Sequence, residues 1–336
     1  MKIVVLAGGL SDERDVSLTS GSLVANALTK NGHDVILVDI YKGIENIKDI
    51  DILFKEKKKY KYNTSEKIPN LKIIKENNNN QENLIGKNII EVCKKADIVF
   101  LALHGSIGEN GKIQALFDLY NIKYTGSGYK GSMLAMDKEI SKRLFKEDNI
   151  KTADYYIYGD NKSISFPLVI KPCNNGSSIG VSIANNNKEF DLALNKLKNC
   201  KDKILVEKYI KGREFSVGII ENNVLPPIEI IPSKGFYDYK NKYQKGYTKE
   251  ICPANISEKL EKKLKKLALK VHKSLYLENY SRIDFILKDD DFYCLEANTL
   301  PGMTPISLLP TEALKSGINY AELCDKLIEI SLKNFL

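Results

Sequence analysis

The sequence lacks any long apolar stretch, and no run approaches the 18 or so residues that a membrane-spanning helix needs. Its first segment, Met1 to Ala7, is apolar but far too short for a signal peptide and leads directly into two glycines. The six cysteines are scattered and form no C-x-x-C pair, which argues against a disulfide framework and against a zinc site. We therefore expect a cytoplasmic protein that has no membrane partner.

Signs of nucleic-acid binding are also lacking, although the net charge is +8. Much of the positive charge lies in the segments 55–61 and 262–270. The second segment has leucines at helical spacing between its lysines, so it predicts the solvent-facing side of a helix. Basic and aromatic residues do not alternate in the way that nucleic-acid surfaces require. We expect no nucleic-acid partner.

With 336 residues, of which 43% are hydrophobic, the chain is long enough for two or three domains. Apolar runs at 2–7, 34–40 and 97–103 predict buried strands, and a helical pattern separates the first two. Strands that alternate with helices predict a parallel sheet and an α/β fold. The stretch 43–92 is rich in lysine and asparagine, and we predict an insertion that forms loops or a structural ornament and carries no chemistry.

The second half of the chain alternates helices with short strands. Helices are predicted at 130–147 and 257–276, and two more helices close the chain. Strands are predicted near 154–158, 167–172, 179–183, 203–209, 280–287 and 292–297, with two more inside 213–232.

Two strand ends place oxygen-bearing side chains on one face. Glu296 and Asn298, in LEANTLPGMT, are two residues apart and so point the same way in a strand, as do Arg282 and Asp284 in RIDFIL. If the two strands are antiparallel neighbours, these side chains converge. Two carboxylates and an amide suit Mg²⁺, and the arginine suits developing negative charge. The alternatives are a polar strand end and a cross-strand salt bridge.

Two glycine-rich segments are candidate phosphate sites. In KPCNNGSSIGV, Lys171 ends an apolar strand and a loop of small residues follows, an arrangement that can hold phosphate or form an ordinary hairpin turn. A Walker A loop is absent. The segment TGSGYKG contains G-x-G-x-x-G, but the acidic residue of a dinucleotide site would fall near Glu147, inside or just past a helix. We therefore do not expect dinucleotide binding.

A third segment, VEKYIKGREF, suits a hinge whose backbone meets adenine. Glu207 and Lys208 end a strand, and Glu214 follows seven residues after Glu207, where its carboxylate can bind ribose hydroxyls. The alternative interpretation is a surface segment of salt bridges.

Two residues lie where strands of the first domain end, the usual place for function in an open parallel sheet. His104 follows the strand at 97–103, and Glu13 lies in the loop after the first strand, where it can receive an ammonium group. The alternatives are a histidine bonded to loop backbone and an acid at a helix N-terminus. His33 and His272 are predicted to lie at a helix end or on a helix surface.

Together these segments resemble the ATP-grasp family of carboxylate–amine ligases over nearly the whole chain, except at about 43–92. The most specific pieces are HGSIGENG, MDK at 136–138, NGSSIGV, RIDF and LEANTLPGMT. The resemblance implies a three-domain architecture that is α/β overall and α+β in its C-terminal part. The implied domains are an N-terminal one at 1–126, a central one at 127–207 and a C-terminal one at 208–336, with ATP between the last two.

The resemblance is greatest to the members that join two D-alanines through an acyl phosphate to make a peptidoglycan precursor. It implies the substrates ATP and D-alanine, two Mg²⁺ ions that Mn²⁺ can replace, and a homodimer. The residues that the resemblance implies for binding the nucleotide are Lys138, Lys171, Ser178, Glu207, Lys208, Ile210, Glu214 and Lys242, and those for binding the metal are Asp284, Glu296 and Asn298. The implied catalytic residues are Glu13, Ser177, Tyr243, Arg282, Gly302 and Ser307. The implied residues for binding D-alanine are His104 and Leu308.

One segment bears on specificity. FYDYKNKYQKG is expected to be the loop that closes the site, and the family pattern puts Tyr243 in a hydrogen-bonded set with Glu13 and Ser177. Relatives that make depsipeptides or D-alanyl-D-serine lack this tyrosine, so we expect D-alanine as the second substrate. The alternatives are D-serine or D-lactate at that position, or a nucleotide-binding regulator without catalysis.

Overall fold

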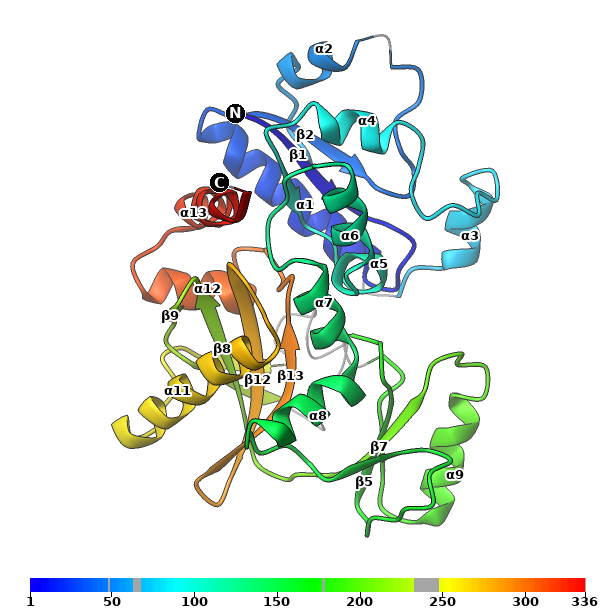
Figure 1. The fold of residues 1–336 in the computed structure, drawn as a ribbon, viewed down its shortest axis with the longest axis vertical. Helices are drawn as coiled ribbons and strands as arrows, with labels where there is room; N and C mark the ends of the chain where they lie inside the picture. The colour runs from blue at the N-terminus through cyan, green and yellow to red at the C-terminus, as the bar shows by residue number, and fades with distance from the viewer. Residues whose placement is uncertain (48, 63–67, 177–178, 233–247, 336) are drawn as a thin grey trace.

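The computed structural model describes residues 1–47, 49–62, 68–176, 179–232 and 248–335. These residues form three sheets, one in each third of the chain, with helices packed between and around them (Figure 1). Within the described ranges, no helix is both long and apolar enough to cross a membrane.

The N-terminal sheet is parallel, with the strand order β2-β1-β3. Its strands are β1 (Lys2–Ala7), β2 (Asp34–Asp39) and β3 (Ile98–Leu101), and β1, which is buried from Ile3 onward, lies in the middle. Helix α1 (Arg14–Lys30) approaches this sheet closely, because a Cβ atom on Gly21 would lie 2.7 Å from the Ala7 Cβ. The predicted parallel sheet is confirmed.

The stretch 43–92 was predicted to be an insertion of loops or a structural ornament, and its described residues favour the second. They contain three short helices, α2 (Ile50–Lys55), α3 (Leu71–Glu76) and α4 (Ile89–Lys94). Phe54 and Val92 are buried in the same core as β1, so this stretch covers part of the N-terminal sheet. Its apolar residues are few and widely spaced, so the helices could not be recognised in a stretch of such polar composition.

The single helix predicted at 130–147 is two helices, α7 (Tyr129–Met136) and α8 (Lys138–Glu147). Asp137 between them has an extended backbone, and its side chain accepts hydrogen bonds from the backbone N–H groups of Glu139 and Ile140. An N-cap of this kind starts a new helix and satisfies two of its free donors.

The central sheet is antiparallel, with the order β4-β7-β5-β6. Helix α9 packs on β5 and β6. The bounds are β4 (Tyr155–Ile157), β5 (Leu168–Pro172), β6 (Ser182–Ala184), α9 (Asn187–Lys196) and β7 (Ile204–Lys208).

The C-terminal sheet is antiparallel, with the order β11-β10-β8-β12-β13, and β9 pairs with β8. One face packs against α11, and the other face packs against α12 where Gly218 meets Leu309. The bounds are β8 (Arg213–Ile220), β9 (Asn223–Val224), β10 (Ile228–Pro232), β11 (Thr248–Ile251), α11 (Glu258–Ser274), β12 (Tyr280–Lys288), β13 (Asp291–Asn298) and α12 (Leu308–Lys315).

His272 was predicted to lie at a helix end or on a helix surface, and it lies in the last turn of α11. It is only 5% exposed there, and its Nδ1 lies 2.7 Å from the hydroxyl of Ser281 on β12, so it does not lie on the surface. The sequence pattern shows leucines on this helix but cannot show that a strand serine lies opposite the histidine.

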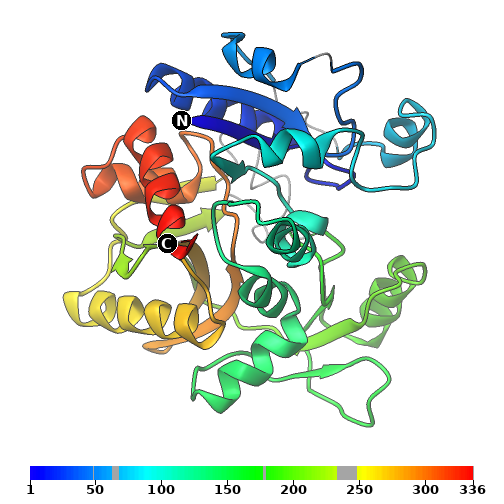
Figure 2. The ribbon, with the colours of Figure 1, turned by 45° about the horizontal axis from the view of Figure 1, so that its top comes forward.

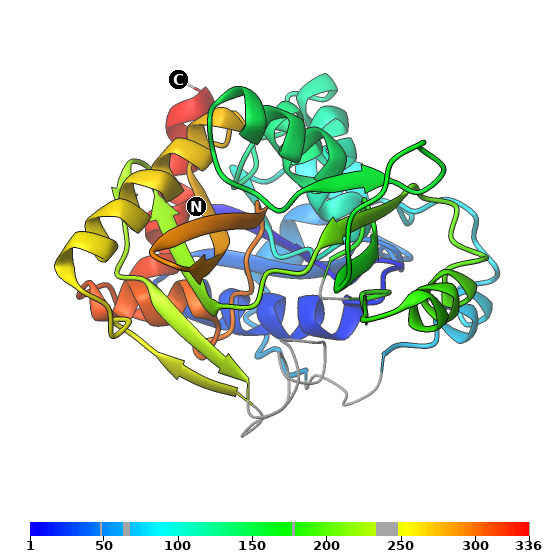
Figure 3. The same cartoon turned by 90° about the horizontal axis from the view of Figure 1, so that it is seen from below.

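The last long helix, α13 (Tyr320–Leu332), returns to the N-terminal sheet and is followed by the short 3-10 turn η1 (Lys333–Phe335). Leu323 and Leu327 share one core with β1 and β3. The first and last parts of the described chain therefore pack in one core, and Figures 1 and 2 show α13 in red beside the blue N-terminal segments. Seen from below, the central and C-terminal sheets lie on opposite sides of the molecule (Figure 3).

Candidate active site

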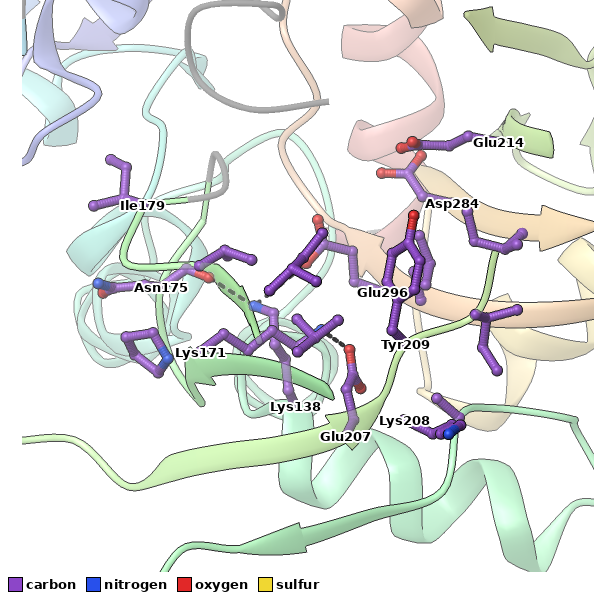
Figure 4. Close-up of a pocket in the computed structure, with 18 residues that line it drawn as sticks. Lys138, Lys171, Asn175, Ile179, Glu207, Lys208, Tyr209, Glu214, Asp284 and Glu296 are labelled. Carbon is purple, nitrogen blue, oxygen red and sulfur yellow. Dashed lines mark hydrogen bonds and ion pairs between the residues drawn. The ribbon is translucent and has the colours of Figure 1, made fainter. Parts of the chain in front are cut away.

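A cleft opens between the central and C-terminal sheets and encloses about 960 Å³ of space, part of it open to solvent (Figure 4). Strands β5 and β7 supply one wall, and β12 and β13 supply the other. The residues that line it are Lys138, Ala153, Val169, Lys171, Pro172, Asn175, Ile179, Val181, Ile183, Glu207, Lys208, Tyr209, Ile210, Glu214, Asp284, Ile286, Leu295 and Glu296.

Two buried lysines face this cleft. Lys138 Nζ donates to the Asn175 carbonyl at 2.6 Å and lies 3.3 Å from Glu296 Oε2. Lys171 Nζ lies 2.5 Å from Glu207 Oε1. The two lysines are only 7% and 8% exposed, so their charges act at short range with little screening by water. Such a pair suits an anionic ligand with several phosphates.

Glu207 holds two lysines at once. Its second oxygen, Oε2, lies 2.8 Å from Lys142 Nζ on α8. Burial raises the pKa of Glu207, but the charges of Lys142 and Lys171 outweigh it and hold the pKa at about 2. A carboxylate has four lone-pair directions. Glu207 therefore keeps room for the adenine contact that the family resemblance implies.

The hinge after β7 forms an apolar slot. Its Tyr209 and Ile210 line the cleft together with Val169, Ile286 and Leu295, so a flat heterocycle such as adenine can pack between apolar side chains. The ammonium of Lys208 is engaged by Ser165 and by the Phe166 carbonyl at 2.9 Å, and its backbone N–H donates to the Asp154 carbonyl at 2.8 Å. Glu214 lies on the same sheet face as Asp284, at the far end of the slot (Figure 4).

Strands β12 and β13 bring the predicted oxygen ligands together. They are antiparallel, and Asp284 pairs with Glu296 while Arg282 pairs with Asn298. The predicted convergence of the two motifs is therefore confirmed as geometry. Asp284 is 6% exposed and accepts hydrogen bonds from Arg282 Nη2 at 2.8 Å, Arg282 Nε at 3.0 Å, Ser216 Oγ at 2.9 Å and Asn298 Nδ2 at 3.0 Å.

The donor types fit a hard divalent cation. Asp284, Glu296 and Asn298 offer carboxylate and amide oxygens, and Mg²⁺ typically takes one or two carboxylates and completes its shell with phosphate and water. All four lone-pair directions of Asp284 are used by neighbouring donors, so one donor must turn away before a cation binds. If the Asn298 amide turns by 180°, its NH₂ group no longer donates to Asp284, and its oxygen takes the place of the NH₂ group beside the cation.

Glu13 is 7% exposed and lies against two glycines. A Cβ atom would approach its Oε2 to 2.5 Å from Gly105 and to 3.0 Å from Gly176, so only glycine fits at Gly105 without movement. A buried carboxylate of this kind can receive an ammonium group.

His104 lies next to this carboxylate and uses both ring nitrogens within the protein. Its Nδ1 lies 3.0 Å from the Leu300 carbonyl, and its Nε2 lies 3.3 Å from Ser20 Oγ. Burial lowers the pKa of His104 in spite of the nearby Glu13. The neutral ring therefore ties α1 to the loop that carries Gly302, which supports the interpretation of a histidine bonded within the protein.

One residue was missed by the sequence reasoning. Glu109, in HGSIGENG, accepts a hydrogen bond from the Gly105 N–H at 2.6 Å. Burial and the charge of Glu13 raise its pKa to about 7. A second carboxyl group therefore lies beside Glu13. The motif contained this residue, but only the fold shows the two carboxyl groups to be neighbours.

The loop before α12 carries the remaining predicted residues. A Cβ on Gly302 would lie 2.9 Å from Ser307 Oγ, which itself accepts from the Thr304 N–H at 3.1 Å. Leu308 is 6% exposed and packs on Ile228 and Ile230, so only its backbone can meet a substrate. Ser177, Ser178, Lys242 and Tyr243 lie outside the described residues.

Comparison with known proteins agrees with this geometry. The sequence model for the D-ala D-ala ligase N-terminus matches residues 2–127, and the model for the D-ala D-ala ligase C-terminus matches residues 132–329. The chain is 42% identical to a D-alanine–D-alanine ligase of Pediococcus pentosaceus, over 98% of this chain and 97% of that one.

Another relative, the D-alanine–D-alanine ligase of Lacticaseibacillus casei, is 39% identical over 99% of this chain and 96% of its own length. The fold is similar to the crystal structure of the Bacillus anthracis enzyme of the same name in complex with ATP. That comparison has a TM-score of 0.76 and 30% identity, and it covers 99% of this chain and 97% of the other. Because both family models and full-length relatives match, the chain belongs to the D-alanine–D-alanine ligase family.

Proposed function

We propose that this chain joins two molecules of D-alanine to D-alanyl-D-alanine, with ATP converted to ADP, in the supply of peptidoglycan precursors. One observation carries the proposal. Two buried lysines, Lys138 and Lys171, face two carboxylates, Asp284 and Glu296, across one cleft in a chain that aligns with such ligases along nearly its full length. Use of D-serine or D-lactate, or a regulator without catalysis, is less favoured.

The carboxylate of the first D-alanine is a poor electrophile and must be activated before an amine can attack it. The carboxylate of the first D-alanine attacks the γ-phosphate of ATP, which releases ADP and leaves an acyl phosphate. Lys138 and Lys171 neutralise charge on the transferring group. Glu13 receives the ammonium of this first substrate.

The amine of the second D-alanine then attacks the acyl phosphate, the C–O bond to phosphate breaks, and the departing phosphate takes the proton that the amine loses. The negative oxygen that forms in this step is stabilised by Arg282 and the Gly302 N–H. His104 positions the Gly302 loop through the Leu300 carbonyl. Ser307 and the backbone of Leu308 bind the carboxylate of the second substrate.

We further propose that Asp284, Glu296 and Asn298 hold Mg²⁺, for which Mn²⁺ can substitute. When bound, the metal supplies charge neutralisation at the phosphates. The nucleotide is held by the Tyr209–Ile210 backbone, Glu207 and Glu214. Domain limits near 126 and 207, assembly as a homodimer and a cytoplasmic location belong to the same proposal and rest on the family resemblance.

The test is ADP release from ATP and Mg²⁺ with and without D-alanine, with the product identified by mass. We expect D-alanine-dependent release and a D-alanyl-D-alanine product. Glu296→Gln is expected to lower kcat/KM roughly 100-fold, because it removes a charged ligand beside the phosphates. Glu258→Gln, on the exposed start of α11, is the matched control and is expected to behave as the unaltered protein.

Two results would contradict the proposal in different ways. Release that requires D-serine or D-lactate would keep the ligase chemistry and change the second substrate. ATP binding without turnover on any of these substrates would leave a nucleotide-binding protein.

A further inference from the structure

Lys142 is a buried cation that the proposed chemistry does not use. It lies on α8, one helical turn after Lys138, and its side chain is only 1% exposed. It is not among the residues that line the cleft. A buried ammonium group is costly unless it is paired and hydrogen-bonded, so its partners indicate what it does.

Those partners connect three elements. Lys142 Nζ lies 2.8 Å from Glu207 Oε2 on β7, and it donates to Thr152 Oγ1 at 2.6 Å. Thr152 Oγ1 in turn donates to the Cys294 carbonyl on β13 at 2.9 Å. The same contacts therefore tie the wall of the cleft that holds Glu207 to the wall that holds Glu296.

Glu207 is shared between two lysines that differ in access to the cleft. Lys171 takes Oε1 and lines the cleft, whereas Lys142 takes Oε2 and lies behind it. The three side chains together carry one net positive charge. Without Lys142, Glu207 and Lys171 would form a neutral pair, and the charge of Lys171 would be balanced before any phosphate arrived.

We propose that Lys142 is a positioning residue for nucleotide phosphates, which acts by neutralising Glu207 so that the charge of Lys171 remains available to the ligand. This inference rests on the proposed binding of ATP in the cleft. It assigns Lys142 a role without contact to the nucleotide, through a carboxylate that both lysines share. The expected signature is a loss of affinity that grows with the number of phosphates on the ligand.

The experiment compares dissociation constants for adenosine, AMP and ADP by calorimetry in the full-length protein, together with kcat and KM for ATP. In Lys142→Met, we expect the affinity for ADP to fall roughly tenfold or more and that for adenosine to change much less, because only the phosphates feel the lost charge. KM for ATP should rise more than kcat falls. Lys146→Met, on the exposed side of α8, is the control and should leave all values unchanged.

A second variant separates charge from folding. In Lys142→Met with Glu207→Gln, the carboxylate that pairs with Lys171 is gone as well, so we expect the ratio of ADP affinity to adenosine affinity to return toward that of the unaltered protein. The ratio is the readout because the loss of the Glu207 carboxylate weakens the adenine contact of both ligands alike. Equal losses for adenosine and ADP in Lys142→Met, or a ratio that does not recover in the double variant, would overturn the inference. These outcomes differ from a failure of the proposed function, in which the unaltered protein would not bind ADP at all.

Discussion

At the scale of single residues, a buried side chain with a shifted pKa makes the stability of this protein depend on pH. His272 is enclosed between α11 and β12, where burial lowers its pKa to about 4 from the ordinary value of 6.5. The folded state therefore holds the neutral ring, and Ser281 satisfies its Nδ1. An unfolded chain binds a proton at higher pH than the folded chain does.

This difference predicts a loss of stability in mild acid. The contribution of His272 is complete above pH 6.5 and is lost as the pH falls from 6.5 toward 4. In that window we expect the free energy of unfolding to fall by up to about 1.4 kcal/mol per pH unit from this group. The measurement is urea unfolding at pH 7.5 and 5.0, compared with His272→Asn, whose amide keeps a partner for Ser281 without titrating. An identical pH dependence in the variant would contradict the prediction.

At the scale of elements, the break between α7 and α8 places Lys138 at the mouth of the cleft. One continuous helix over 129–147 would carry residue 138 in its interior. Instead the extended backbone at Asp137 starts a second helix, with Lys138 as its first residue and its Nζ on the Asn175 carbonyl. The cap is therefore part of the construction of the phosphate site.

Removing this cap should weaken both the fold and the site. We expect Asp137→Ala to lower the free energy of unfolding by about 1 kcal/mol and to raise KM for ATP, because the first turn of α8 loses the acceptor for two N–H groups. Asp137→Asn keeps an oxygen acceptor and is expected to lose much less. Chemical denaturation and steady-state kinetics on both variants check this. Equal losses in the two would show that the charge of Asp137 matters and the cap does not.

At the scale of the whole molecule, the two ends of the chain share one core. Helix α13 buries Leu323, Leu327 and Ile328 against the N-terminal sheet, and Asp325 bonds to Asn31 at 2.8 Å and to His33 at 3.0 Å. The sheet whose strands lead into Glu13 and His104 is thus completed by a helix from the other end of the chain. The stability of the sheet should depend on this helix.

We expect Leu327→Ala to lower the free energy of unfolding by about 2–5 kcal/mol, since it opens a cavity in this core. Amide hydrogen exchange in β1 and β3 should accelerate as well, although both strands are far from the substitution in sequence. Leu314→Ala, at a residue that is 59% exposed on α12, is the matched control and should stay within about 0.5 kcal/mol of the unaltered protein. Faster exchange confined to α13 would contradict the shared core.

The sequence by itself determined most of the strands and one part of the site. The period of two in strands placed Glu296 with Asn298 and Arg282 with Asp284. The structure makes the two strands antiparallel neighbours, which brings the two pairs of side chains together. The resemblance of the motifs to a known family identified Lys138 and Lys171, and both line the cleft. The alternation of side chains in a strand can be read from the sequence because it depends only on neighbours along the chain.

Other features were decided by the tertiary structure alone. The pairing of Glu207 with Lys142, the approach of Glu109 to Glu13 and the burial of His272 all depend on which element lies opposite. The packing partner of α13 was decided in the same way. Its apolar face predicts that one side is buried, but it does not indicate which sheet lies opposite. A side-chain pattern states which face is buried, but the partner and the resulting pKa arise from contacts between distant segments, because charge and burial act through space and not along the chain.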